Sequence, residues 1–209
     1  MDLNGDGRID ILSGSWPGEL FLFLGQAHHT FAAPIMLRDK DGAIINIGGG
    51  ITEESNGRIL IRGHAEFERT DEGTFVNYHG KRMESTPAKP IAITGTASTA
   101  VPTDWDADGD YDLIIGDIRG NVHLLPNEGT PNEYAFGQPT QLFRVDSGRA
   151  GPCAADWDAD GDLDLLVGAG DGSVTLYRNV GTTREPRLAD GKQIVPPGEA
   201  THGPQAPRE

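Results

Sequence analysis

The sequence predicts an all-β fold, made of β-propeller blades that are four-stranded antiparallel sheets, with about three to four blades in a partial propeller. Three observations predict this fold. A nine-residue acidic motif occurs at residues 2–10, 104–112 and 156–164. Each copy is followed by a short apolar run that ends in glycine, with a second glycine four residues later. The second and third copies align without gaps at an offset of 52 residues, which is enough chain for four short strands.

Each unit contains four strand-like stretches in a fixed order. The first is rich in small residues, as at 100–103 and 153–155, and it precedes the acidic motif. The second is the apolar run, and the glycine pair after it predicts a tight hairpin to a third strand. The fourth is an extended stretch at 136–142, with counterparts at 31–37 and, more weakly, at 188–194. The acidic motif is therefore expected to form the loop between the first two strands.

These units suggest the domain organisation. Residues 2–38 are expected to form a blade without its inner strand, 39–96 an insertion or a degenerate blade, 97–148 and 149–200 two blades with an acidic loop each, and 201–209 the run-up to a further blade. Both ends of the chain are thus expected to fall within blades of a longer propeller. The alternative is that the C-terminal segment completes the first blade of a small closed ring, although its two prolines at 204 and 207 disfavour a strand there.

The stretch 39–96 leaves two interpretations open. It contains strand-like segments at 57–63, 65–68 and 74–78, and its length is that of one blade. Its Asn-Gly-Arg-Ile sequence at 56–59 repeats the end of the first acidic motif, but Thr52, Glu54 and Leu60 stand at three of the acidic positions. If it is an insertion, it is the best candidate for a partner-binding surface, because long excursions often carry function.

The charge of the chain is concentrated in the motifs. The net charge is −15, yet 13 of the 32 acidic residues lie in the three motifs, and the remaining 19 nearly balance the 17 basic residues. An acidic chain of this kind is disfavoured as a partner of nucleic acid or of an anionic membrane surface. No apolar run is long enough to span a membrane. Cys153 is the only cysteine, which excludes an intrachain disulfide and a cysteine-based zinc cluster.

The motif has the composition of a calcium loop. Calcium takes six to eight oxygen ligands at about 2.3–2.6 Å, and carboxylates at positions 1, 3 and 5 of a tight loop can converge on one point. Glycine at position 6 allows a sharp reversal that turns the carbonyl of position 7 inward, and the aspartate at position 9 would close the shell. An EF-hand is excluded, because position 12 is Ser13, Ile115 or Val167 and a strand follows in place of a helix.

The pattern Asp-x-Asp-x-Asp-Gly-x-x-Asp, followed by an apolar strand and glycine, resembles the FG-GAP/VCBS repeats of integrin α-subunits and of bacterial surface and secreted proteins. The resemblance covers residues 2–38 and about 97–207. It implies Ca²⁺ in each loop, three ions in all, and a weaker site in the first loop because Asn4 replaces an aspartate there. The implied ligands are Asp2, Asn4, Asp6 and Asp10; Asp104, Asp106, Asp108 and Asp112; Asp156, Asp158, Asp160 and Asp164; and the carbonyls of Arg8, Asp110 and Asp162.

The resemblance implies a non-catalytic binding or scaffold module of an exported bacterial protein, found outside the cell, on its surface or in the periplasm. Its partners would be a protein or carbohydrate ligand and the remaining blades of a longer chain. No metalloprotease, serine-hydrolase or phosphate-binding motif occurs, so the chain is not expected to be an enzyme. The alternative is the propeller portion of a secreted, lyase-like polysaccharide enzyme with its active site elsewhere. Convergence of His64, Tyr78, His79 and Arg82 on one cleft would favour that alternative.

Overall fold

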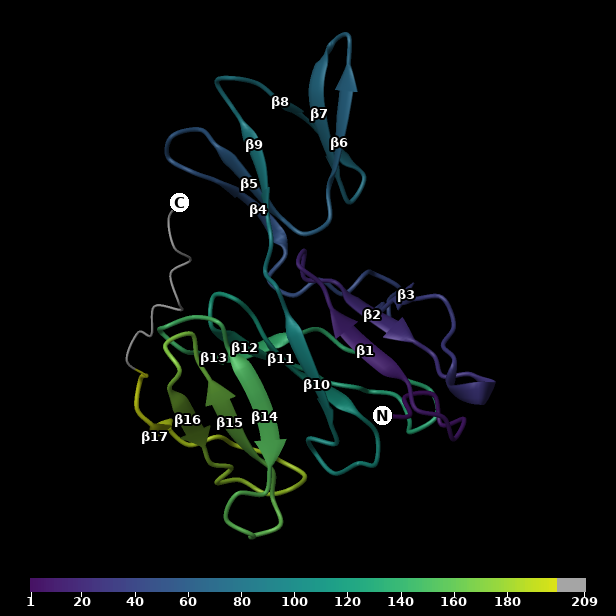
Figure 1. Cartoon of the computed structure of the whole chain (residues 1–209), viewed down its shortest axis with the longest axis vertical. Coiled ribbons are helices and arrows are strands. Elements are labelled where there is room, and N and C mark those ends of the chain that lie inside the picture. The colour runs from purple at the N-terminus through teal and green to yellow at the C-terminus, as the bar shows by residue number, and fades with distance from the viewer. Residues whose placement is uncertain (199–209) are drawn as a thin grey trace, which may run out of the picture.

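In the computed structural model, residues 1–198 are described, and they form an all-β molecule whose strands gather into five small sheets (Figure 1). The all-β prediction is therefore confirmed. A single turn of 3₁₀ helix, Ala27–His29, is the one helical element among these residues, and no helix there is long and apolar enough to cross a membrane. The expected run-up to a further blade at 201–209 lies outside the described residues, as do residues 199 and 200.

Two of the sheets are four-stranded antiparallel meanders, as the sequence predicts. The three sheets that adjoin an acidic loop are called the first, second and third sheets, in chain order. The second sheet contains β10 (Thr99–Thr103), β11 (Asp112–Gly116), β12 (Asn121–Leu125) and β13 (Thr140–Arg144). The third sheet contains β14 (Gly151–Ala155), β15 (Asp164–Gly168), β16 (Val174–Tyr177) and β17 (Lys192–Val195). In both sheets the acidic motif connects the first strand to the second.

The first sheet has three strands, β1 (Ile11–Gly14), β2 (Leu20–Phe23) and β3 (Ile35–Met36). They correspond to the last three strands of the other two sheets, and β1 pairs with β2 in the register in which β11 pairs with β12. The first acidic motif, at residues 2–10, precedes β1.

Residues 39–96 do not form a four-stranded meander. They contain a sheet of β4 (Gly50–Glu53), β5 (Ile59–Arg62) and β9 (Ile91–Thr94), and another sheet of β6 (Glu66–Thr70), β7 (Gly73–Tyr78) and β8 (Lys81–Ser85). Strands β5 and β9 are parallel, because β6, β7 and β8 lie between them in the chain and provide the long crossover that parallel strands require. The part from β4 to β9 has its own small core and projects from the other three sheets in Figure 1, whereas Ile45 and Ile47 belong to the apolar cluster between the first and second sheets.

The first, second and third sheets stack in chain order. One apolar cluster lies between the first and second sheets, and another lies between the second and third. Successive side chains of a strand point to opposite faces, so Leu113 and Ile115 belong to one cluster and Ile114 to the other. All five residues of β11 are buried because its sheet is covered on both sides. That these sheets belong to a propeller stays a prediction.

Candidate metal centre

The acidic loops contain a repeated left-handed backbone conformation. The sequence predicts a sharp reversal at motif position 6, and Gly109 and Gly161 have φ angles of +101° and +94° there. A second left-handed residue stands at position 4, where Ala107 and Ala159 have φ angles of +55° and +61° and Gly5 has +67°. For an alanine this conformation costs roughly 1–2 kcal/mol, so the rest of the loop must impose it. The glycine was predictable from the motif, but the strained alanine was not.

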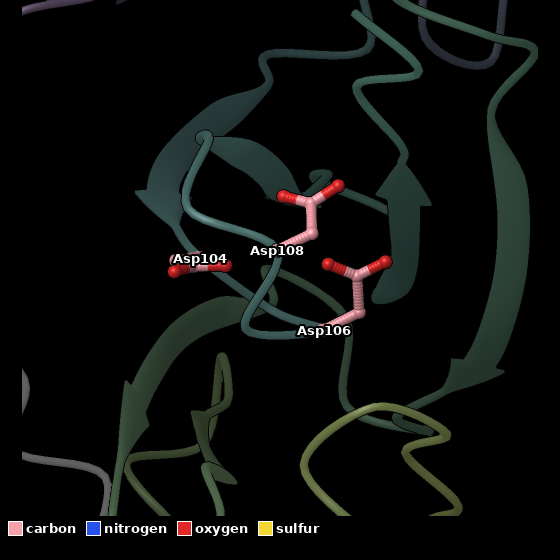
Figure 2. A group of neighbouring side chains, drawn as sticks. All are labelled: Asp104, Asp106 and Asp108. Atoms are coloured by element: carbon pink, nitrogen blue, oxygen red, sulfur yellow. The ribbon is translucent and has the colours of Figure 1, made fainter. Parts of the chain in front are cut away.

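The second loop brings three carboxylates together. Oxygen atoms of Asp104, Asp106 and Asp108 all lie within 4.8 Å of one another, and Figure 2 shows the three side chains on one turn of the loop. Among residues 1–198, the Oδ1 atoms of Asp104 and Asp106 are buried and have no hydrogen-bond partner, and the same holds for Oδ1 of Asp110. Buried acceptors without donors are uncommon, because each one forfeits its hydration. This donor set fits a hard divalent cation such as Ca²⁺, which prefers carboxylate oxygens.

Asp110, at motif position 7, takes more part in the cluster than the sequence suggests. We expected only its carbonyl to matter, but its side chain is 4% exposed. Burial, followed by the charges of Asp108, Asp106 and Asp104, raises the pKa of Asp110 to about 6. Its backbone N–H donates a hydrogen bond of 3.0 Å to Asp108. The second loop thus holds four carboxylates close enough to influence one another.

The aspartate at motif position 9 has a structural role in every loop. Asp112 accepts hydrogen bonds from the N–H groups of Trp105 (3.1 Å) and Asn127 (2.7 Å), one on each carboxylate oxygen. Burial raises the pKa of Asp112 to about 6, against the opposing effect of these two bonds. The matching bonds are Leu3 and Gly25 to Asp10, and Trp157 and Asn179 to Asp164. This aspartate ties the loop to the chain that follows the hairpin, and its part in metal binding stays a prediction.

An asparagine that the site prediction did not include supports the position-9 aspartate. Oδ1 of Asn127 accepts hydrogen bonds from the N–H groups of Gly129 (3.2 Å) and Ala135 (2.8 Å) and so closes the turn after β12. Asn179 does the same in the third sheet, whereas the first unit has Gly25 at this position. The signal for this role was present in the sequence, since the two asparagines recur 52 residues apart.

The third loop differs from the second in its surroundings. Asp156, Asp158 and Asp160 are again within 4.8 Å of one another, but they are exposed. The guanidinium group of Arg178 pairs with Asp158 and provides a positive charge within the loop. The residue that aligns with Arg178 in the second unit is Pro126, which carries no charge, and no basic residue among those described pairs with Asp104, Asp106 or Asp108.

The first loop also contains its own arginine. The Arg8 guanidinium lies 3.0 Å from Asp6. Burial acts to raise the pKa of Asp6, but hydrogen bonds from the Arg8 N–H, Asn4 and the Arg8 side chain outweigh it and lower that pKa. The carboxylate of Asp2 accepts the N–H groups of Asp6 and Gly7. Internal donors thus satisfy the carboxylates of Asp2 and Asp6, whereas Oδ1 of Asp104, the counterpart of Asp2 in the second loop, accepts no hydrogen bond from the described residues.

The four residues that would favour an enzyme do not converge on one cleft, although the Tyr78 ring packs edge-on against that of His79, with centroids 4.3 Å apart. His64 and His79 line one pocket of about 230 Å³ between the first sheet and the 39–96 segment. The Tyr78 hydroxyl instead donates to a backbone carbonyl of β5. Arg82 pairs with Glu68 at 2.9 Å and covers an aromatic ring of β7. Two of the four residues thus share a pocket, and the other two are engaged elsewhere.

Comparison with known families agrees with the repeat structure. Residues 104–167 match the family model of the FG-GAP-like repeat. The matched stretch begins at the second acidic loop, runs through the second sheet and ends within β15, after the third acidic loop. No curated protein sequence matches the chain. The family match supports the resemblance for the part of the chain that contains the two most acidic loops.

Proposed function

We propose, from the FG-GAP-like character of residues 104–167, that the chain is a calcium-binding β-propeller segment. It would act as a non-catalytic binding or scaffold module of an exported protein. The repeat match and the stacked antiparallel sheets support the propeller part of this proposal. The geometry of the second loop supports calcium.

The observation that carries the calcium proposal is the set of unpartnered oxygens in the second loop. Asp104, Asp106 and Asp110 each hold a buried carboxylate oxygen that accepts no hydrogen bond from residues 1–198. A bound calcium ion would supply positive charge and coordination to these oxygens. Asp112 and the two left-handed residues, meanwhile, keep the loop in a shape that directs the carboxylates to one side. Metal binding of this kind stabilises the folded state, because the site does not exist in the unfolded chain.

The three loops are proposed to differ in affinity. The second loop has four neighbouring carboxylates and, in the described part of the chain, no arginine paired with them, so it is proposed to bind calcium most tightly. In the first and third loops, Arg8 and Arg178 neutralise part of the charge, and calcium must compete with them. The first loop also carries Asn4 in place of an aspartate.

The 39–96 segment is the proposed partner-binding surface, because it forms separate sheets outside the stack and exposes apolar side chains such as Phe67. Its partner would be a protein or a carbohydrate. The enzymatic alternative would need a cleft that gathers several catalytic groups. His64 and His79 share a pocket and the Tyr78 ring packs against His79, but the Tyr78 hydroxyl is bonded to a backbone carbonyl and Arg82 pairs with Glu68, so the non-catalytic function is preferred.

Thermal melting in calcium, in magnesium and in EDTA tests the calcium proposal. At a calcium concentration 1,000-fold above the dissociation constant, binding adds about 4 kcal/mol to the free energy of unfolding. This corresponds to a melting temperature higher by roughly 8–16 °C for a chain of this size. Magnesium should stabilise much less, because it demands a smaller octahedral site. Equal melting temperatures in calcium and EDTA would refute the proposal.

A further inference from the structure

A short connection between β9 and β10 brings three parts of the molecule together. Residues 95–98 lead from the projecting sheet of β4, β5 and β9 back to the second sheet (Figure 1). The backbone carbonyl of Trp16, in the β1–β2 turn, accepts the N–H groups of Thr96 and Ala97. The carbonyl of Thr96 in turn accepts the N–H group of Ile118, in the β11–β12 turn. Turns of the first and second sheets therefore both contact this connection.

Arg62 reaches the same place from the projecting sheet. It is the last residue of β5, and it pairs with Thr94, the last residue of β9, in the parallel ladder. Its guanidinium group donates a hydrogen bond of 2.8 Å to the Thr52 hydroxyl, whereas its Nε atom is buried and has no acceptor among residues 1–198. A buried donor without an acceptor is costly, because it has lost its hydration. The contacts of the described chain thus satisfy this guanidinium group only in part.

Two further arginines lie at the β11–β12 turn. Arg119 follows Ile118 and is half-buried, and Nε of Arg144, on β13, donates a hydrogen bond of 3.1 Å to the Arg119 carbonyl. Burial, followed by the positive charge of Arg62, lowers the pKa of Arg119, and the charge of Arg144 acts in the same direction. We call these three residues the arginine cluster. Among residues 1–198, no carboxylate forms an ion pair with any of them.

The carboxylate of Asp117 offsets only part of this charge. It is the one described acid that acts on the pKa of Arg119, and it is 1% exposed. Its oxygens already accept the backbone N–H groups of Arg119 (2.8 Å) and Asn121 (2.9 Å) and the Asn121 side-chain amide (2.7 Å). Three guanidinium groups against this single carboxylate leave a net of two positive charges.

The acidic loops lie at the other end of the second sheet. Consecutive connections of an antiparallel meander alternate between its two ends, so the loop before β11 and the turn after it lie apart. The five steps from Asp112 to Asp117 span roughly 17 Å of strand. Electrostatic interactions in solution are screened within about 8 Å at physiological ionic strength. The arginine cluster therefore attracts anions although the chain as a whole has a net charge of −15.

An exposed aromatic ring lies at the same connection. The side chain of Trp16 is 61% exposed, yet one face of its indole lies on the backbone of Gly95, where an added Cβ atom would approach the ring to 2.3 Å. Gly95 stands between the residue that pairs with Arg62 and the residue that bonds to the β11–β12 turn. The indole is thus fixed on one face and presents a flat apolar surface, which suits the C–H face of a sugar ring.

We propose that this corner binds an acidic carbohydrate, with the arginine cluster holding a carboxylate or sulfate group and Trp16 contacting the adjoining sugar ring. The proposal names a partner class for the binding module put forward above, and it rests on that function. Guanidinium groups bind planar oxyanions with pairs of parallel hydrogen bonds, which gives both charge and orientation. A bound anion also removes the repulsion that Arg62 and Arg144 exert on Arg119.

Calorimetric titration of the full chain in calcium buffer tests the inference with three hexasaccharides. A hyaluronan hexasaccharide carries carboxylates alone, a chondroitin sulfate hexasaccharide carries carboxylates and sulfates, and chitohexaose carries no charge. The tighter of the two charged hexasaccharides identifies the preferred group, and it should bind at least about tenfold more tightly than chitohexaose. Hexaglutamate should bind at least about fivefold more weakly than that saccharide, because it offers Trp16 no sugar ring.

Substitutions assign the binding to this corner. Arg62→Gln and Arg119→Gln each remove one guanidinium group, and each should weaken binding of the preferred saccharide about tenfold to 100-fold. Trp16→Ala should weaken it about fivefold. The matched control is Arg69→Gln, an exposed arginine on β6 outside the arginine cluster, which should bind as the wild type does. Circular dichroism and thermal melting verify that each variant is folded, and Arg144→Gln replaces Arg62→Gln if the latter unfolds.

Three results would overturn the inference: equal binding of charged and neutral hexasaccharides, undiminished binding by both arginine variants, or hexaglutamate binding as tight as that of the preferred saccharide. The last result would make the partner an acidic protein. A chain that calcium stabilises but that binds no acidic saccharide would contradict this inference and leave the calcium proposal intact. A chain that binds the saccharide but melts at the same temperature in calcium and in EDTA would do the opposite.

Discussion

Replacing Asp106 by asparagine should change the stability of the protein in opposite directions with and without calcium. The carboxylate of Asp106 lies within 4.8 Å of those of Asp104 and Asp108, and its Oδ1 atom is buried with no hydrogen-bond donor near it in the described part of the chain. Without a cation, the substitution removes two repulsive pairs while the shape of the side chain is kept. With calcium, it removes a charged ligand.

The magnitudes follow from the distances. Two like charges about 5 Å apart repel by roughly 1–3 kcal/mol between the dielectric constant of water and that of a protein surface. Side-chain rotation relieves part of this repulsion, so D106N should gain about 1–2 kcal/mol in EDTA. A 100-fold loss of calcium affinity costs about 2.7 kcal/mol at saturating calcium. The net effect in calcium is then a loss of about 1 kcal/mol.

Urea denaturation of D106N and the wild type, each in EDTA and in calcium, measures the predicted gain and the predicted loss in the free energy of unfolding. Asp71→Asn is the matched control, because Asp71 is an exposed aspartate in the β6–β7 turn, away from the acidic loops, and its replacement should have the same small effect in both buffers. If D106N destabilised the protein equally in EDTA and in calcium, Asp106 would be a structural residue and the reasoning would be wrong.

Three further predictions concern the loops and their supports. Arg178→Gln should raise the calcium affinity of the third loop about twofold to fivefold, measured by calorimetric titration, because it removes the cation paired with Asp158. Metal-free protein should lose roughly 2 kcal/mol of unfolding free energy between pH 5 and pH 7.5, measured by urea denaturation. Asp110 and Asp112 have pKa values raised to about 6 in the folded protein. Their stabilising contribution to the free energy of unfolding is therefore complete below about pH 3.8 and disappears as the pH rises through 6. Asn127→Ala should cost about 2 kcal/mol in urea denaturation, because two backbone N–H groups lose their acceptor.

Each of these predictions has a contrary result. An unchanged third-site affinity in Arg178→Gln, with Arg184→Gln as the exposed control, would mean that the ion pair does not compete with calcium. Metal-free stability that rises between pH 5 and pH 7.5 would contradict the direction of the two pKa shifts. A cost below about 0.5 kcal/mol for Asn127→Ala would show that water replaces its carbonyl oxygen.

The recurring motif allowed much of the fold to be predicted. The offset of 52 residues, the paired glycines and the apolar runs define strand order and hairpins, because these depend on local sequence. They also locate the carboxylates at positions 1, 3 and 5 of the second and third loops, which the structure brings together. Topology within 39–96 was not predictable, since the parallel pairing of β5 with β9 depends on which distant strands meet.

The motif sequence also could not predict how equivalent sites differ from one another. Trp105 and Trp157 stand in nearly identical sequences, yet one is buried and the other exposed, because burial depends on the sheet that lies against them. Arg178 lies 14 residues beyond Asp164, outside the motif, and its pairing with Asp158 depends on the hairpin that returns it to the loop. The offset between repeats identifies equivalent positions, but tertiary contacts determine the burial and the charge pairing of each residue.

A crystal structure of the chain grown in millimolar calcium tests the central claim most directly. The account predicts an ion in the second loop, among the carboxylates of Asp104, Asp106 and Asp108, with six to eight oxygen ligands at about 2.3–2.6 Å. Well-ordered carboxylates in that loop with no ion between them at this calcium concentration would contradict it.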